Sequence, residues 1–265
     1  MDYSKNSVVL ITGASQHIGA ALSHYFANKL GTGSLLILTS RSIERLNKVW
    51  QSAKEQRPQM PDIHLLQWNL KDTEPETYRK DLIDACLKNG SSPASFSQAL
   101  IVHNGASLGD VSTRVVDMND PKKLRDQLDT NLVSMVVLNS VFFNVFDTAA
   151  QRFLVNLTAP SAVRAVPCFG MSSLVKPSRL MVLNVLAKEE KNIKVLHFDP
   201  VGVDSESVRT IRDTAHDPEI RKWIQGFYER RELLTADIVA AALGETLEKG
   251  SYESGDEVNA LSVHS

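Results

Sequence analysis

Short apolar runs alternate along this chain with longer segments whose apolar residues recur at helical spacing, and this alternation restricts the fold more than any other feature. Continuous runs rich in Val, Ile and Leu are typical of parallel strands that are covered on both faces. Strands that alternate with helices predict an α/β fold, a doubly wound parallel sheet of the Rossmann type. The expected strands are residues 8–11, 35–38, 63–68, 99–102, 153–157, 194–198 and 257–261.

Helical periodicity is clearest at residues 43–53 and across the longer segment 124–146. Asp217 before Pro218 predicts a helix start, because Asp caps a helix and proline fits its first turn. No repeat, low-complexity tract or linker divides the chain. The sequence therefore predicts a single dinucleotide-binding domain over residues 1–265, with about seven strands and with helices on both faces of the sheet.

Composition narrows the partners that we expect. The formal net charge is −2 at pH 7, which gives no electrostatic basis for binding nucleic acid. Cys86 and Cys168 are too few for a disulfide framework or a zinc site, and Cys168 has no flanking His or Arg that would favour a thiolate. The polar first residues do not resemble a signal peptide, and no apolar run approaches the roughly 20 residues of a membrane span. We expect a cytoplasmic protein without metal or membrane contacts.

The first expected strand leads into a glycine turn, residues 12–19, and then into a helix. Such a turn binds pyrophosphate because free N–H groups and the helix dipole both favour an anion. A plain turn between a strand and a helix is the alternative. We expect His17 to lie at the rim of the pocket rather than to act as a catalyst. The expected phosphate-binding residues are Gly13, Ser15, Gln16, His17, Ile18 and Gly19.

The end of the second expected strand favours NADP(H) over NAD(H). An acidic residue there would hold the ribose hydroxyls of NAD, but no acidic residue lies between the end of this strand and Glu44. Arg41 offers charge-assisted hydrogen bonds to the 2′-phosphate of NADP, with Ser42 beside it. A solvated arginine at a helix start is the alternative reading of Arg41.

The glycine turn resembles the Thr-Gly-x3-Gly-x-Gly motif of the short-chain dehydrogenase/reductase family, with His17 at the middle glycine. Residues 107–112 and 217–222 resemble the sepiapterin reductase branch of that family, and the resemblance spans about residues 7 to 260. It implies an NADPH-dependent reduction of a pterin side-chain carbonyl, as in tetrahydrobiopterin synthesis. It also implies a homodimer formed by the 124–146 helix and the helix after Pro177.

Two of the family's catalytic groups are missing. The resemblance places Lys176 and Asn131 at their usual positions, but Ser172 stands at the tyrosine position and Ala159 at the serine position. Serine is a far weaker acid than a phenol, and general acid catalysis is usually worth about 10²- to 10⁴-fold. The sequence therefore predicts weak or lost reductase activity. The alternative is a catalytically inactive relative that binds NADP or pairs with an active paralogue.

The resemblance also implies the remaining contacts to ligands. Asn259 stands where the family holds the pterin with an acidic residue on the last strand, and Ser161 is the other expected substrate contact. His103, His197 and Asp199 are rival acid–base groups at strand ends, where ligands bind in this architecture. The further expected cofactor contacts are Asn69, Leu70, Asn104, Lys176 and Ser205.

Pro177 affects the expected position of Lys176. Proline disfavours helical backbone in the residue before it and clashes with the carbonyl four residues back. The sequence therefore predicts a helix that begins at Pro177, with residues 172–176 in the loop that leads into it. Lys176 on such a loop would not necessarily face the ribose.

Overall fold

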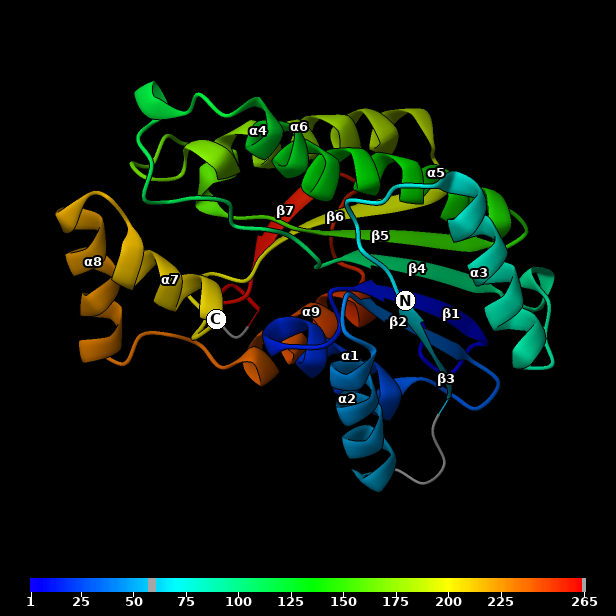
Figure 1. The fold of residues 1–265 in the computed structure, drawn as a ribbon. Helices are drawn as coiled ribbons and strands as arrows, with labels where there is room; N and C mark the ends of the chain where they lie inside the picture. The colour runs from blue at the N-terminus through cyan, green and yellow to red at the C-terminus, as the bar shows by residue number, and fades with distance from the viewer. Residues whose placement is uncertain (57–60, 264–265) are drawn as a thin grey trace.

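A computed structural model describes residues 1–56 and 61–263. Within these residues, seven parallel strands form one sheet in the order β3-β2-β1-β4-β5-β6-β7 (Figure 1). The predicted α/β fold is confirmed, and each expected strand overlaps an observed one. The strands are β1 (Ser7–Thr12), β2 (Leu35–Ser40), β3 (Asp62–Gln67), β4 (Gln98–His103), β5 (Gln151–Leu157), β6 (Ile193–Asp199) and β7 (Asp256–Asn259).

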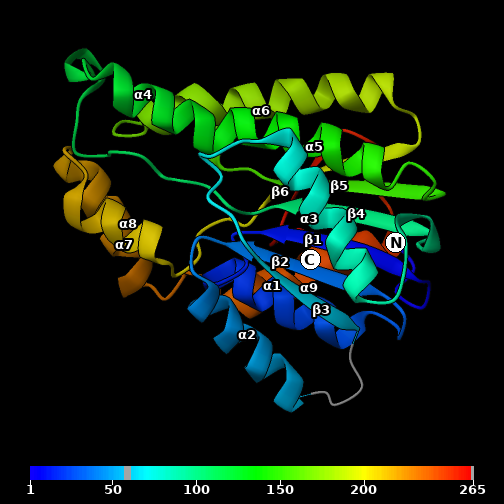
Figure 2. The ribbon, with the colours of Figure 1, turned by 45° about the vertical axis from the view of Figure 1, so that its right-hand side comes forward.

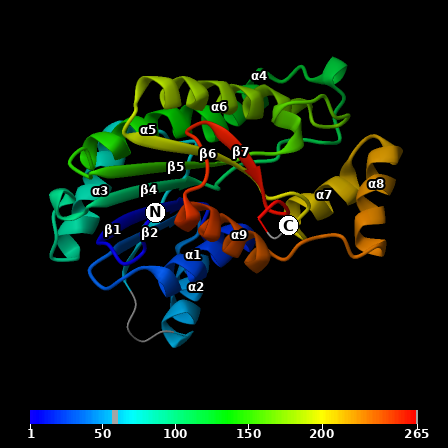
Figure 3. The ribbon, with the colours of Figure 1, turned by 180° about the vertical axis from the view of Figure 1, so that it is seen from behind.

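Helices cover both faces of the sheet. In Figures 1 and 3, α1, α2 and α9 lie on one face and α3, α5 and α6 on the other, over two separate clusters of buried apolar side chains. Helices α7 and α8 lie outside these layers. The α-helices are α1 (His17–Lys29), α2 (Ile43–Gln56), α3 (Pro75–Lys88), α4 (Pro121–Leu128), α5 (Ser134–Val145), α6 (Gly170–Glu189), α7 (Glu206–Thr214), α8 (Pro218–Glu229) and α9 (Ala236–Lys249).

Short helical turns complete the fold. Three are 3₁₀ turns: η1 (Pro93–Ser95), η2 (Val115–Asp117) and η4 (Pro160–Ala162). A π-helical turn, η3 (Asp129–Val133), joins α4 to α5. In the described part of the chain, this continuous segment, Pro121–Val145, is long and apolar enough to cross a membrane, but half of its most apolar stretch is buried. Figure 2 shows it running beside α6, which is how a core helix packs.

The order of the strands reverses between β1 and β4. From β1 the chain proceeds outward through β2 to β3, and then returns to pair β4 with the other side of β1. Ile11 therefore has Leu38 on one side and Val102 on the other. The crevice outside the carboxyl ends of strands at such a switch point is where ligands bind in doubly wound folds.

The expectation that a helix begins at Pro177 is wrong. Helix α6 starts at Gly170 and runs through the proline to Glu189. Val175 before the proline and Leu183 after it are both fully buried, so one apolar face continues across it. An interior proline costs roughly 3 kcal/mol, and full burial of one large aliphatic side chain returns about 1.5–3 kcal/mol. Packing of the whole face therefore overrides the local signal and places Lys176 on the helix.

Candidate functional site

The glycine turn after β1 is packed directly against the end of β4. A Cβ atom on Gly13 would lie 2.6 Å from the Cα of Gly105, and one on Gly19 would lie 2.1 Å from the carbonyl oxygen of Gly13. The Asn104 side chain donates hydrogen bonds to the carbonyls of Thr12, at 3.0 Å, and Gly13, at 2.9 Å. Only glycine therefore fits at positions 13 and 19, because a Cβ at either position would overlap neighbouring backbone atoms.

Helix α1 begins with unsatisfied backbone donors. Its N-cap residue, Gln16, makes no side-chain hydrogen bond to the first turn, and that turn contains no acidic residue. The first N–H groups of a helix have no intrahelical acceptor. In contrast, Ser205 caps α7 by accepting a hydrogen bond from the Val208 N–H at 3.4 Å. The start of α1 is therefore suited to an anionic ligand.

His17 connects the glycine turn to α7. It has a left-handed backbone, with φ at +46°, and its side chain is half-buried. Its Nε2 atom accepts a hydrogen bond from the Glu206 N–H at 3.3 Å. The imidazole thus lies between the N-termini of α1 and α7.

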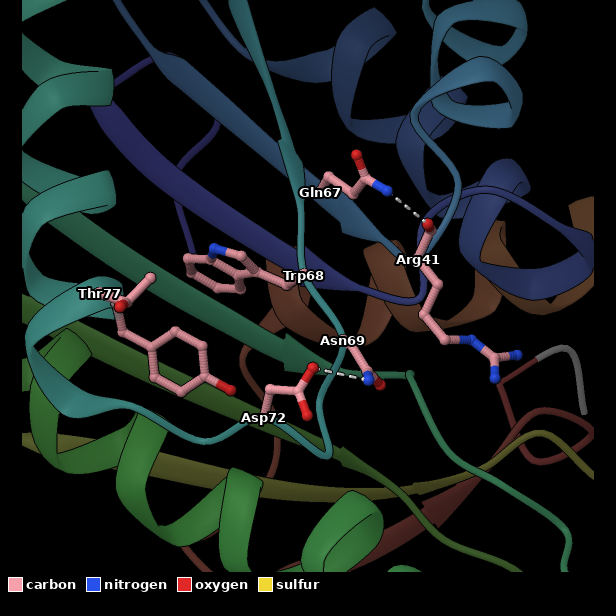
Figure 4. Close-up of a pocket in the computed structure, with 7 residues that line it drawn as sticks. Arg41, Gln67, Trp68, Asn69, Asp72 and Thr77 are labelled. Carbon is pink, nitrogen blue, oxygen red and sulfur yellow. Dashed lines mark hydrogen bonds between the residues drawn. The ribbon is translucent and has the colours of Figure 1, made fainter.

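A cavity of about 280 Å³ lies at the ends of β2 and β3 (Figure 4). Arg41 has an exposed guanidinium with no carboxylate partner among the described residues, and its carbonyl accepts a hydrogen bond from Gln67 at 3.1 Å. The Trp68 and Tyr78 rings pack together, 4.6 Å apart between centroids. The cavity therefore combines aromatic surface with a free cation. It is lined by Arg41, Gln67, Trp68, Asn69, Asp72, Thr77 and Tyr78.

Asn69 and Ser42, two of the expected cofactor contacts near this cavity, form hydrogen bonds with residues close to them in the sequence. The Asn69 side chain donates to Asp72 at 2.9 Å (Figure 4). The Ser42 hydroxyl donates to Glu44 at 2.8 Å and accepts from the Arg45 N–H at 3.3 Å. Both side chains therefore shape the turns beside the cavity.

Two serine hydroxyls occupy the position where the resemblance expects a phenol. Ser172 on α6 and Ser161 on η4 are both buried, and their oxygens lie 2.9 Å apart. Ala159 carries no hydroxyl, while the Thr158 hydroxyl is buried without a hydrogen-bond partner in the described structure. The Tyr228 hydroxyl donates instead to the Asp204 carboxylate at 3.0 Å. The site therefore presents aliphatic hydroxyls in place of an acidic one.

Lys176 lies one helical turn beyond Ser172. Its Nζ donates to the Leu157 carbonyl at the end of β5, at 2.7 Å. Burial of the ammonium group lowers the pKa of Lys176 to about 7, the nearby Arg179 cation lowers it further, and the Asp199 carboxylate acts in the opposite direction. Near neutral pH this amine exists in both its charged and its neutral form.

Asn131 lies in the π-turn between α4 and α5, and both ends of its amide are engaged. Its oxygen accepts from the Ser107 N–H at 2.8 Å, and its nitrogen donates to the Gln127 carbonyl at 3.0 Å. These bonds hold the loop after β4 against the long helix. The side chain is therefore a positioning group in this arrangement.

Arg179, which the sequence analysis missed, is a buried cation behind the site. It is 1% exposed, donates to the Asn156 side chain at 2.9 Å, and donates to the His103 carbonyl at 3.2 Å. The sequence does contain a signal for it. Arg179 lies seven residues after Ser172 and three after Lys176, a spacing that puts these residues on one face of a helix. This contact joins α6 to the ends of β4 and β5.

His103 and His197, the two rival acid–base histidines, are both buried and both lie near the Arg179 cation. Burial, and then the Arg179 cation, lower the pKa of His103 to about 3 and that of His197 to about 4. His103 lies 2.5 Å from the Asn139 side-chain oxygen, and His197 lies between the amides of Asn156 and Asn184. Both rings are neutral at physiological pH and cannot act there as acids.

Asn259, the expected pterin contact, is engaged in a turn after β7. Its side-chain oxygen accepts from the Leu261 N–H at 3.1 Å and from the Ser262 N–H at 2.9 Å. The third rival, Asp199, likewise accepts from the Val201 N–H at 2.9 Å. Both side chains stabilise the backbone at the carboxyl ends of β6 and β7.

Comparison with known proteins shows which family this chain is similar to. A family model for the short chain dehydrogenase matches residues 7–216. Sepiapterin reductase from Meriones unguiculatus is 29% identical over 255 residues, covering 96% of this chain and 95% of that protein.

Solved structures support the same fold. A short chain dehydrogenase from Shigella flexneri 2a, solved in complex with NADP, has a TM-score of 0.77 at 20% identity, covering 98% of this chain and 99% of the other. The KRED1-Pglu enzyme has a TM-score of 0.80 at 18% identity, and the match covers 96% of this chain and 100% of that enzyme.

The lowered pKa of Lys176 predicts a rise in stability with pH. Its folded-state pKa, about 7, lies below the ordinary value of 10.5, so the unfolded chain binds more protons between these values. Unfolding free energy should therefore increase across that window, by less than the limit of about 1.4 kcal/mol per pH unit for one proton. We expect Lys176→Met to remove this increase in urea titrations, and Lys188→Met, an exposed control on the same helix, to retain it. Parallel curves for the wild type and Lys176→Met would contradict the assignment.

Proposed function

This chain belongs to the short-chain dehydrogenase family, and we propose that it binds NADP(H) and a small carbonyl compound, with reductase activity that is weak or lost. The observation that carries the proposal is the buried hydroxyl pair of Ser161 and Ser172, 2.9 Å apart, which stands beside Lys176 where a phenol is expected. The binding apparatus is retained while the strong proton donor is not.

The proposed cofactor site runs from the glycine turn to the cavity beside Arg41. The start of α1, which no side chain of its N-cap residue caps, suits the pyrophosphate, and the Arg41 guanidinium, without a carboxylate partner in the described part of the chain, suits a 2′-phosphate. Bound NADPH would supply the hydride. The residues proposed to hold it are Gly13, Ser15, Gln16, His17, Ile18, Gly19, Arg41, Ser42, Asn69, Leu70, Asn104, Lys176 and Ser205.

Proton delivery limits the proposed reaction. An aliphatic hydroxyl does not release a proton near neutral pH, so Ser172 and Ser161 can only orient a carbonyl oxygen or pass a proton along. The remaining proton sources are water and the Lys176 ammonium, whose pKa is lowered to about 7. The resemblance to sepiapterin reductases makes a pterin side-chain carbonyl, and hence tetrahydrobiopterin synthesis, the first substrate class to test. Asn259 and Ser161 are its proposed contacts.

A second candidate function is binding without turnover. The same missing phenol favours it, together with Ala159 at the family's serine position. In this reading the chain is an inactive NADP-binding relative in the cytoplasm that regulates or pairs with an active paralogue. Its two cysteines, both unpaired, are consistent with a reducing compartment.

An exposed apolar patch on η3, α5 and α6 supports a homodimer. These elements lie side by side on one face of the molecule (Figure 2). Surface aliphatic side chains that are gathered in this way mark an interaction site. The patch consists of Val133, Val136, Leu174, Met181, Val182 and Val185.

Two lysines placed in this patch should separate the proposed dimer. We expect Met181→Lys combined with Val185→Lys to sediment as a monomer at concentrations where the wild type is a dimer, because a buried unpaired ammonium is strongly disfavoured. Leu87→Lys, an exposed position on α3 outside the patch, should leave the dimer intact. A wild type that is monomeric at every concentration would overturn the proposal.

Arg41 should determine the choice of cofactor. We expect Arg41→Ala to weaken NADPH binding by about tenfold and to leave NADH binding nearly unchanged, because only NADPH carries the phosphate that the guanidinium pairs with. Fluorescence titration of both cofactors gives the two affinities. Arg45→Ala, an exposed arginine one turn further on α2, is the matched control. Equal loss of both cofactors would contradict the proposed role of Arg41.

Restoring the missing hydroxyls separates the two functions. We expect Ser172→Tyr with Ala159→Ser to raise NADPH oxidation with sepiapterin or small diketones by about 10²-fold, the usual contribution of a general acid. NADPH affinity should not change, and Ser173→Tyr, at the exposed neighbouring position on α6, should give no gain. Wild-type turnover as fast as that of an intact reductase would refute weak activity, and failure to bind either ligand would refute both candidate functions.

A further inference from the structure

Cys168 and His216 form a pair of reactive side chains away from Ser172 and Lys176. They are 48 residues apart in the sequence, and the fold brings the Cys168 sulfur within 3.9 Å of His216 Nε2. Cys168 precedes α6, and His216 lies between α7 and α8. The nearby site does not use either side chain.

The surroundings of His216 determine which of its nitrogens carries the proton. Nδ1 lies 3.3 Å from the carbonyl oxygen of Val111, which can only accept a hydrogen bond. Nδ1 therefore carries the hydrogen in the neutral ring, and Nε2 presents its lone pair to Cys168. This is the arrangement in which an imidazole can take the proton of a thiol.

A backbone donor completes the surroundings of the sulfur. The Asp217 N–H points to the Cys168 sulfur at 3.4 Å, and Asp217 is the N-cap residue of α8, a helix of 12 residues. The positive end of a helix and a hydrogen bond to sulfur both stabilise a thiolate. A base and an anion-stabilising donor thus converge on one sulfur atom.

Cys86 provides a contrast within the same chain. It is fully buried on α3 among apolar side chains, and burial raises the pKa of its thiol to about 11. No imidazole contacts it among the described residues. Cys168 is also largely buried, at 5% exposed, but it belongs to a small cluster between the outer helices and the loop after β4, separate from the two main cores. Its φ angle of +71° is an uncommon conformation for a residue other than glycine.

We propose that Cys168 is a nucleophilic thiol, with His216 as its base, that reacts with disulfides. The thiol proton moves to His216 Nε2, and the thiolate attacks one sulfur of the disulfide. A bond forms between the Cys168 sulfur and that sulfur while the original S–S bond breaks. The second sulfur leaves as a thiolate with the electron pair, and the proton on His216 returns to it through solvent. Cys168 is oxidised to a mixed disulfide, and the leaving sulfur is reduced to a thiol.

The reaction of the native full-length chain with Ellman's disulfide reagent tests this assignment. We expect one fast thiol in the wild type, retained in Cys86→Ala and lost in Cys168→Ser and in Cys168→Ala. Mass spectrometry of the partially labelled wild type should find the adduct on Cys168, and this result does not depend on the folding of any variant. Labelling of Cys86 first, or of Cys168 only at the rate of global unfolding, would overturn the proposal.

Variants of His216 distinguish a base from a structural contact. Asn at position 216 retains an N–H donor for the Val111 carbonyl but cannot take up a proton. We expect His216→Asn to slow the fast reaction by about tenfold or more. In His216→Ala, free imidazole should restore part of the rate, since it can supply the missing base. A rate unchanged in His216→Asn would show that the imidazole is not the base and would refute the dyad.

Discussion

The contact between the glycine turn after β1 and the end of β4 is the constraint on which the rest of the site depends. Gly13 and Gly19 lie so close to neighbouring backbone that no Cβ fits at either of them, and the Asn104 amide joins the two segments. This contact lies at the point where the order of the strands reverses. It fixes the start of α1, and therefore the direction in which its free N–H groups point.

The side chains beside this contact include no hydroxyl as acidic as the phenol that the family pattern places there. The fold brings Ser161 on η4 within 2.9 Å of Ser172 on α6, and joins Lys176 on the same helix to the end of β5. Burial lowers the pKa values of Lys176, His103 and His197, and the buried Arg179 cation lowers them further. The proposed site therefore offers hydroxyls that could orient a carbonyl, beside an amine that is partly deprotonated near pH 7.

The outer helices bring together groups that have no relation in the sequence. His17 reaches the start of α7, and His216, between α7 and α8, reaches Cys168. Each contact connects the outer helices to a loop near the strand ends. The glycine turn and the Cys168 thiol are therefore both in contact with residues at the ends of α7.

The sequence by itself determined the sheet, the glycine turn and the missing phenol. These follow from local signals: apolar runs long enough for buried strands, glycine at fixed spacing, and the absence of tyrosine between Tyr78 and Tyr228.

Only the tertiary structure decided which local signals prevail and which distant groups meet. Pro177 predicted a helix start, but an apolar face running through Val175 and Leu183 holds α6 together across it. No pattern in the sequence pairs Cys168 with His216, because their contact depends on where α7 and α8 pack. Burial likewise sets the pKa of Lys176, since desolvation is a property of the surrounding fold and not of the residue itself.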